Sequence, residues 1–319
     1  ISRFDLPFDS DSLFPTSLSY NDNNIIVNGD EFSLSFSLEN GFLNEFSYRN
    51  IKLFEGVLQP FFWRAPTDND LGNNMPERCL IWKNAHNELL LQSLDTSSIG
   101  NIKQIKTIHF HEKSQSRLEL SYSIFGNGII KLKQTIYPSG ADYPELPRFG
   151  MKVTLPSSFS DFEWFGRGPH ESYWDRKASA KVDRFSGKVW DQTYKYVRPQ
   201  ETGNKTDVRW MSLYNGSIGI MVKGLPTFDG SVHHYDYDIL DYTKDSQRHG
   251  KIDIKKGNQI DLLIDYKQMG VGGDNSWGAM THSKYTLPMD TTIYNLEYAI
   301  IPFNKKNELE ALSRININN

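Results

Sequence analysis

Apolar and polar residues alternate along much of this chain. Between residues 32 and 38, Phe and Leu occupy every second position, and Ser occupies the positions between them. This period of two is typical of a strand that has one face buried and the other in water. The same period occurs at 118–124 and again at 294–300. We therefore predict a chain that is largely β.

Tight turns are predicted between these strands. Asn-Gly pairs stand between apolar runs, and such pairs favour a short turn that joins two antiparallel strands. A single sheet would leave much of its apolar surface in water, so we expect stacked sheets. The predicted fold class is all-β, with large antiparallel sheets. The four Asn-Gly pairs are at 28–29, 40–41, 127–128 and 215–216.

The pattern also suggests how the chain is divided. Residues 21–304 are predicted to form one β domain, because turn residues are spread evenly and no Pro- or Gly-rich break divides them. Residues 1–20 are rich in Ser, Asp and Pro, and we expect a linker or the remnant of a preceding domain. Residues 305–319 are expected to form a polar tail with helical character. Two short helices are predicted, from Pro76 to about Asn87, where proline suits the first turn, and from Lys305 to Arg314.

Composition excludes several classes of protein. The 16 Tyr, 19 Phe and 7 Trp favour sheets and sugar-facing surfaces. A net charge of −4, without a dense Lys/Arg stripe, argues against nucleic acid as a partner. The single Cys79 excludes an internal disulfide framework and a cysteine-rich zinc site. No apolar run approaches the ~20 residues that span a bilayer, so we expect no membrane partner. The chain opens with Ile1 rather than Met, which indicates a piece of a longer protein.

Residues 269–278 (MGVGGDNSWG) are the stretch least suited to a regular strand. Their glycines permit positive φ and close approach of a ligand to the backbone. The step Asp274-Asn275 favours turns closed by side chains. A large aromatic, Trp277, lies near the end of the loop. Two interpretations stay open: the indole is a platform for a flat ligand, or it plugs the end of a core, as most large aromatics do.

Residues 63–72 (WRAPTDNDLG) form a second segment dense in polar side chains. Asp and Asn oxygens suit hard cations, so a cation or sugar site is one interpretation. The spacing of a calcium-binding loop is absent, however. We favour a structural knot in which Asp68 or Asp70 pairs with Arg64 and caps turns.

Residues 164–176 place His170 beside Glu171, a pair that could act as acid and base. Adjacent residues of a strand point to opposite faces, so the two need not share a site. His233 and His234 diverge for the same reason and have no third ligand at a recognisable spacing, so we predict no metal site. For 164–176 we favour a buried arginine–carboxylate network that pins a loop. The network would consist of Arg167, Glu171, Asp175 and Arg176.

Four segments carry a resemblance when they are taken in order. They are 62–70 (FWRAPTDND), 166–176 (GRGPHESYWDR), 199–204 (PQETGN) and 269–277 (MGVGGDNSW). Together they resemble the C-terminal, small-chain-like domain of lacZ-type bacterial β-galactosidases of glycoside hydrolase family 2. The resemblance implies a supersandwich of antiparallel sheets similar to galactose mutarotase. It also implies a soluble bacterial protein, of the cytoplasm or the periplasm.

The resemblance implies an accessory part of an active site. In that family two glutamates of a separate, upstream TIM-barrel domain carry out catalysis, and a retaining pair lies about 5–5.5 Å apart. No position here matches either glutamate, so we expect no catalytic residue, no cofactor and no activity in the isolated chain. Trp277 matches the tryptophan that this domain supplies to the wall of the galactoside pocket, and Asp274 and Asn275 are the expected substrate-binding neighbours. The expected partners are a β-galactoside or related glycan and the upstream barrel.

Two alternatives remain. A free-standing aldose 1-epimerase on the same sandwich would need an acid and a base across the sugar ring. His170, His233 or His234 could be paired with Glu171 or Glu201 in those roles, although no epimerase motif supports them. The second alternative is a non-catalytic carbohydrate-binding module that holds glycans through exposed aromatics.

Overall fold

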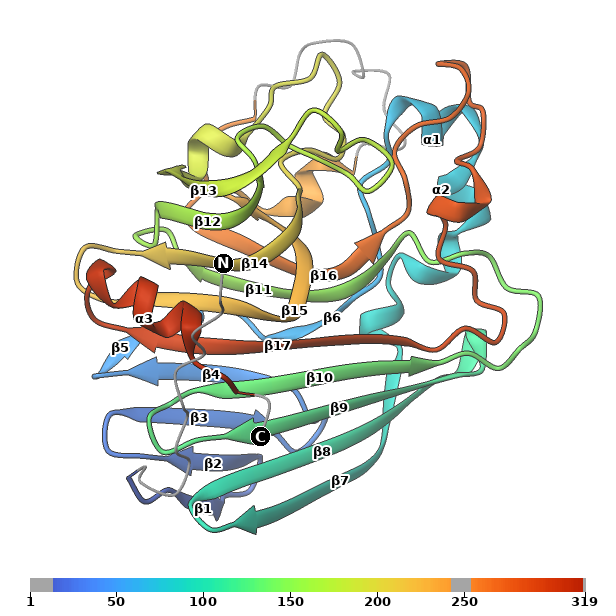
Figure 1. Cartoon of the computed structure of the whole chain (residues 1–319). Coiled ribbons are helices and arrows are strands. Elements are labelled where there is room, and N and C mark those ends of the chain that lie inside the picture. Colours follow the sequence, from blue (N-terminus) through green and yellow to red (C-terminus); the bar gives the residue numbers. More distant parts are fainter. Residues whose placement is uncertain (1–13, 242–253, 318–319) are drawn as a thin grey trace.

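A computed structural model describes residues 14–241 and 254–317 of the chain. Within this part, strands form a five-stranded sheet and a twelve-stranded sheet, and every strand pairing is antiparallel (Figure 1). The predicted all-β fold with large antiparallel sheets is confirmed.

The smaller sheet follows the order of the chain from β1 to β5. Its β3 carries the alternation seen in the sequence, and Leu34 and Phe36 are fully buried. The strands are β1 (Ser17–Tyr20), β2 (Asn24–Asn28), β3 (Phe32–Ser37), β4 (Leu43–Tyr48) and β5 (Ile51–Lys52).

The larger sheet runs in the order β13-β12-β14-β15-β17-β10-β9-β8-β7, and β16, β11 and β6 branch from β15. Its long strands curve across the molecule in Figure 1. Its strands are β6 (Gln59–Phe61), β7 (Leu89–Ile99), β8 (Ile102–His111), β9 (Ser116–Ile124), β10 (Ile130–Tyr137), β11 (Arg148–Pro156), β12 (Asp161–Gly168), β13 (Lys181–Lys188), β14 (Lys205–Tyr214), β15 (Gly219–His233), β16 (Gln259–Gln268) and β17 (Tyr294–Phe303).

The four Asn-Gly pairs all join antiparallel neighbours, as predicted. They connect β2 to β3, β3 to β4, β9 to β10 and β14 to β15. Gly41, Gly128 and Gly216 have φ angles of 71°, 81° and 96°, a region in which a side chain would be strained.

The two sheets share one core. The Phe36 ring of the smaller sheet meets Tyr122 of β9 edge to face, with ring centroids 5.0 Å apart. Phe42 stacks on His109 of β8 with centroids 4.9 Å apart. Aromatic pairs of this kind add to the free energy gained by burying the rings. The prediction of stacked sheets is therefore confirmed.

The helix predicted from Pro76 to Asn87 is wrong as a continuous element. The chain forms the short helix α2 (Met75–Arg78), followed by separate 3-10 turns at Leu80–Trp82 and Ala85–Asn87. Cys79 leaves the helical region at φ −101° and ψ 13°. The interruption brings Trp82 inward, where it is buried and its indole N–H donates to the Pro144 carbonyl at 3.0 Å.

Two other helices frame the domain. Helix α1 (Asp68–Gly72), which the sequence did not predict, lies within the polar segment at 63–72. Near the other end, a 3-10 turn at Lys306–Glu308 leads into α3 (Leu309–Arg314), so the predicted helical character there is confirmed. None of the helices in the described ranges is both long and apolar enough to cross a membrane.

The predicted start of the β domain at residue 21 needs a correction. Residues 17–20 form β1, which pairs with β2, and so belong to the smaller sheet rather than to a linker. Residues 1–13, the greater part of the proposed linker, lie outside the described residues. The other boundaries stay predictions.

Candidate functional site

The glycine-rich segment 269–278 forms a loop that follows β16 and lies beside α1 (Figure 1). Trp277 is 89% exposed, the most exposed of the large hydrophobic side chains described. Burial of an indole is strongly favourable, so exposure on this scale leaves the ring available for a partner. The interpretation of Trp277 as a plug for the core is therefore wrong.

The two residues predicted to bind substrate beside Trp277 have different roles inside the loop. The side-chain oxygen of Asn275 accepts from the backbone N–H of Trp277 at 2.9 Å and from that of Ala279 at 3.3 Å. It thus closes a turn around the tryptophan. Asp274 is exposed and pairs with His282 at 2.7 Å. Contact of either residue with a sugar stays a prediction.

Arg64 holds the beginning of the loop through its side chain. Its side chain is fully buried, and one guanidinium nitrogen donates to the carbonyls of Met269 and Gly270, the latter at 3.1 Å. The other nitrogen pairs with Asp70. A buried guanidinium whose two terminal nitrogens both bind acceptors fixes the groups around it. The prediction of a structural knot at 63–72 is confirmed, with Asp70 as the partner of Arg64.

Helix α1 holds the end of the loop. The Asn69 amide donates to the Ala279 carbonyl at 2.8 Å, and its oxygen accepts from the Gly278 N–H at 3.0 Å. The backbones of Gly72 and Gly278 also pack closely against each other. A Cβ atom at Gly278 would lie only 2.4 Å from the carbonyl carbon of Gly72. Gly278 has a φ of 97°, so glycine is required there for two reasons.

The segment at 164–176 supplies a third support. Asp175 accepts from the Gly272 N–H at 2.9 Å. Arg176 pairs with Glu171 at 2.5 Å, but Arg167 pairs with Asp207 on β14. The predicted single buried network is therefore wrong, because it is divided into separate contacts and the Arg176 side chain is 54% exposed.

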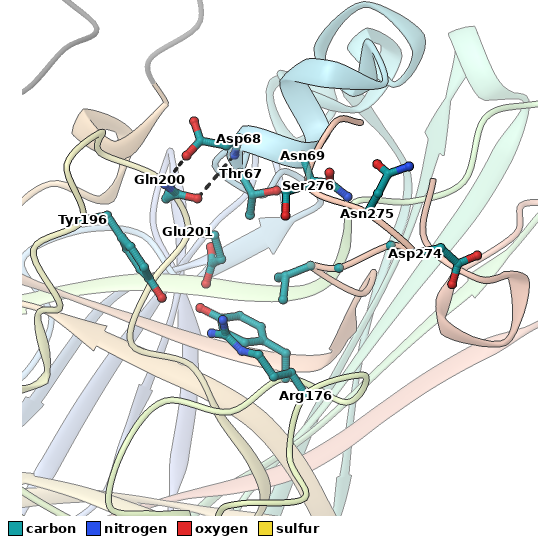
Figure 2. A pocket seen from close by; sticks show the side chains of 14 residues that line it. Thr67, Asp68, Asn69, Arg176, Tyr196, Gln200, Glu201, Asp274, Asn275 and Ser276 are labelled. Atoms are coloured by element: carbon teal, nitrogen blue, oxygen red, sulfur yellow. Dashed lines mark hydrogen bonds between the residues drawn. The ribbon is translucent and has the colours of Figure 1, made fainter. Parts of the chain in front are cut away.

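These loops line an open, polar pocket of about 490 Å³. In Figure 2 the side chains of Glu201 and Arg176 lie between Tyr196 on one side and Asp274 on the other. A ligand pocket of a few hundred Å³ is enough for a small polar molecule. The pocket is lined by Thr67, Asp68, Asn69, Tyr173, Arg176, Tyr196, Gln200, Glu201, Val271, Gly272, Gly273, Asp274, Asn275 and Ser276.

A buried charged cluster, which sequence reasoning missed, adjoins this pocket through Glu201, one of the lining residues. Arg148 on β11 is fully buried, donates to Glu201 at 3.1 Å, and pairs with Asp265 of β16. The Tyr237 hydroxyl also bonds to Glu201. Burial raises the pKa of Glu201 and of Asp265, and the positive charge of Arg148 opposes both shifts. No local pattern signals the cluster, because its members are far apart in the sequence.

Three of the residues suggested for an epimerase, His170, His233 and Glu171, are bonded to other groups. The His170 ring bonds to Ser179 at 3.0 Å. His233 bonds to Ser231 and Tyr235, and burial lowers its pKa to about 3, so it is a neutral ring at physiological pH. Glu171 accepts from Thr202, Gly203, Arg176 and Tyr196. Among the described residues, no three His, Cys, Asp or Glu side chains gather in a way that could hold a metal ion.

The family model described as "Beta galactosidase small chain" matches residues 28–300. The chain belongs to this family. A β-galactosidase of Priestia megaterium is 36% identical over 84% of this chain and 25% of its own length. A β-galactosidase of Halalkalibacterium halodurans is 32% identical over 85% of this chain and 27% of its own length. The chain thus spans about a quarter of the length of these curated relatives.

Solved structures support the predicted fold. A galactose 1-epimerase from Lactobacillus acidophilus aligns with this chain at a TM-score of 0.53. The alignment covers 91% of this chain and 99% of the epimerase. Their sequence identity is 8%, so the likeness concerns the fold alone. The galactose mutarotase-like supersandwich that the resemblance implied is confirmed.

Proposed function

We propose that this chain is the sugar-facing accessory domain of a β-galactosidase, in which Trp277 forms one wall of the galactoside pocket. The catalytic carboxylates then belong to an upstream TIM-barrel domain of the same polypeptide. The observation that carries the proposal is the exposure of Trp277 at 89% on a loop whose backbone is fixed on both sides. An indole face suits the apolar C–H face of a galactosyl ring, and the absence of side chains on the nearby glycines leaves room for the ring.

The relatives give this proposal its substrate. The relatives from Priestia megaterium and Halalkalibacterium halodurans are named β-galactosidases, and this chain matches only 25% and 27% of their length. The residues missing from the match leave space for a barrel. The Glu201 and Glu171 carboxylates of this chain are fully engaged by neighbouring donors, which is consistent with a structural role rather than a retaining pair.

Replacing Trp277 with alanine in the full-length enzyme is expected to raise KM for a β-galactoside by roughly tenfold, because a stacked face is lost from ground state and transition state alike. Steady-state kinetics with a chromogenic galactoside measures this change, and thermal unfolding checks that the fold is intact. Tyr20→Ala removes another exposed aromatic, at the edge strand β1, and should leave KM unchanged. Equal kinetics for Trp277→Ala and the parent would disprove the proposal.

The isolated chain is expected to hydrolyse no β-galactoside, because it supplies a wall of the pocket and not the reacting carboxylates. The assay is release of a chromogenic aglycone by purified chain at high concentration, compared with the full-length enzyme. Measurable turnover that scales with chain concentration and survives further purification would contradict the proposal. Accelerated interconversion of the α and β anomers of free galactose, measured by polarimetry, would instead favour an epimerase.

A further inference from the structure

The Trp277 indole is exposed, yet the loop that carries it is fixed at several backbone atoms. Arg64 binds the carbonyls at the start of the loop, and Asp175 binds the N–H of Gly272 in its first half. Neither contact is close in sequence to the tryptophan. Beside Trp277 itself, Asn275 binds the N–H groups of residues 277 and 279 from within the loop. The contacts made there from outside the loop are those of Asn69 with residues 278 and 279.

Asn69 is suited to fixing this part of the chain. Its amide both donates and accepts, so it binds a peptide N–H and the next carbonyl at once, at 3.0 Å and 2.8 Å. Aspartate could accept but not donate, and alanine could do neither. Both hydrogen bonds can form only when the backbone on the C-terminal side of Trp277 has one position relative to the Asn69 amide.

Helix α1 gives Asn69 a fixed base. The Thr67 side chain accepts from the Asp70 N–H at 3.2 Å, and the Asp70 carboxylate accepts from the Thr67 N–H at 2.8 Å, so the helix start is capped in both directions. Asp70 is also the partner of the buried Arg64. At the other end of the helix, the backbone contact of Gly72 with Gly278 leaves no space for the loop to move closer.

We propose that Asn69 is a positioning residue for the sugar pocket: it sets the place of Trp277 and acts on the galactosyl ring only through that indole. The inference rests on the proposed function of Trp277. Stacking on an aromatic face depends on the separation and tilt of the two partners, and a displacement of about 1 Å is enough to weaken a positioned contact strongly. Asn69 lies on α1 and is one of the residues that line the pocket, but its amide nitrogen and oxygen are both engaged by the backbone of the loop.

The test compares Asn69→Asp and Asn69→Ala in the full-length enzyme. Asn69→Asp keeps the acceptor for Gly278 and places a carboxylate against the Ala279 carbonyl, whereas Asn69→Ala removes both contacts. Each is expected to raise KM for a β-galactoside by roughly three- to tenfold with a smaller change in kcat. Asn73→Asp is the matched control, because Asn73 accepts from Arg78 at the end of the same helix, and its KM should stay at the parent value.

The deciding measurement repeats the Asn69 substitutions in a Trp277→Ala background. If Asn69 acts through the indole, the KM of the double variant should equal that of Trp277→Ala alone, a coupling seen only for residues that act together. An equal rise in KM in both backgrounds would overturn the inference, because Asn69 would then act by another route. An unchanged KM in both Asn69 variants, together with a raised KM in Trp277→Ala, would overturn it and leave the proposed function standing. An unchanged KM in Trp277→Ala would overturn both.

Discussion

Replacing Arg148 with methionine is expected to lower the free energy of unfolding of the chain by about 3–5 kcal/mol. The reason is that the guanidinium is fully buried and is the cation that Glu201 and Asp265 share. Its removal leaves two acidic groups in an apolar interior, and the net cost comes from their desolvation rather than from one lost hydrogen bond. Urea denaturation measures the change as a lower midpoint at constant slope.

An exposed ion pair provides the control for Arg148. Arg184 pairs with Glu163 on the outer strands, and its side chain is 51% exposed, so Arg184→Met should cost less than about 1 kcal/mol. Adding Glu201→Gln and Asp265→Asn to Arg148→Met should recover part of the lost stability, because the unpaired acids become neutral amides. A loss for Arg148→Met no larger than that of the Arg184 control would contradict the assignment of a shared buried cation.

The second large effect concerns Asp229 and pH. Burial raises the pKa of Asp229 to about 7, from its ordinary value of 3.8, while a hydrogen bond from the Asp207 N–H opposes the shift. The folded chain therefore holds this proton more tightly than the unfolded chain does. The stabilisation is complete below pH 3.8 and is lost as the pH rises through about 7. Asp229→Asn, which stays neutral, should gain stability relative to the parent between pH 4 and pH 8, by on the order of 4 kcal/mol.

Urea unfolding of Asp229→Asn and the parent at several pH values measures this gain. His233 has the opposite effect, because burial lowers its pKa to about 3. The folded chain therefore becomes less stable as the pH falls below 6.5 and the unfolded chain takes up this proton. It is present in both proteins and cancels in their difference. Asp183 is the contrasting control, since Lys181 lowers its pKa, and Asp183→Asn should give a difference of the opposite sign. A difference for Asp229→Asn that does not change with pH would show that the carboxyl is already charged in the fold.

Local patterns in the sequence were sufficient to predict the sheets. The alternation at 32–38 reflects one buried face, and the Asn-Gly turns depend on the conformation of a single glycine, so neither needs knowledge of the rest of the fold. The helix expected at 76–87 was wrong because burial of Trp82 and Cys79 broke the helix into shorter turns. Packing thus overrode a local signal that was correct for the first turn only.

The site could be predicted in its parts but not in its assembly. The family resemblance predicted that Trp277 would be available to a ligand. The pairing of Arg64 with Asp70 was predicted from their proximity in the sequence. The main acceptors of Arg64 are, however, carbonyls of the loop at 269–270, and Asn69 likewise binds backbone atoms. Backbone N–H and C=O groups are present at nearly every position, so the pattern of side chains does not predict which of these groups will be bound. Arg148 was missed because its acidic partners, Glu201 in the loop before β14 and Asp265 on β16, are far from it in the sequence.

The contact between Asn69 and Gly278 joins residues 209 positions apart in the sequence. On a ribosome, α1 therefore emerges long before the loop that it holds, and its Asn69 amide faces water while most of the larger sheet is still being made. Contacts of such long range form late, because the chain between them must first be ordered. A nascent chain that has begun to build its core thus still lacks the fixed loop of Trp277, which is completed only when nearly all of the domain has been synthesised.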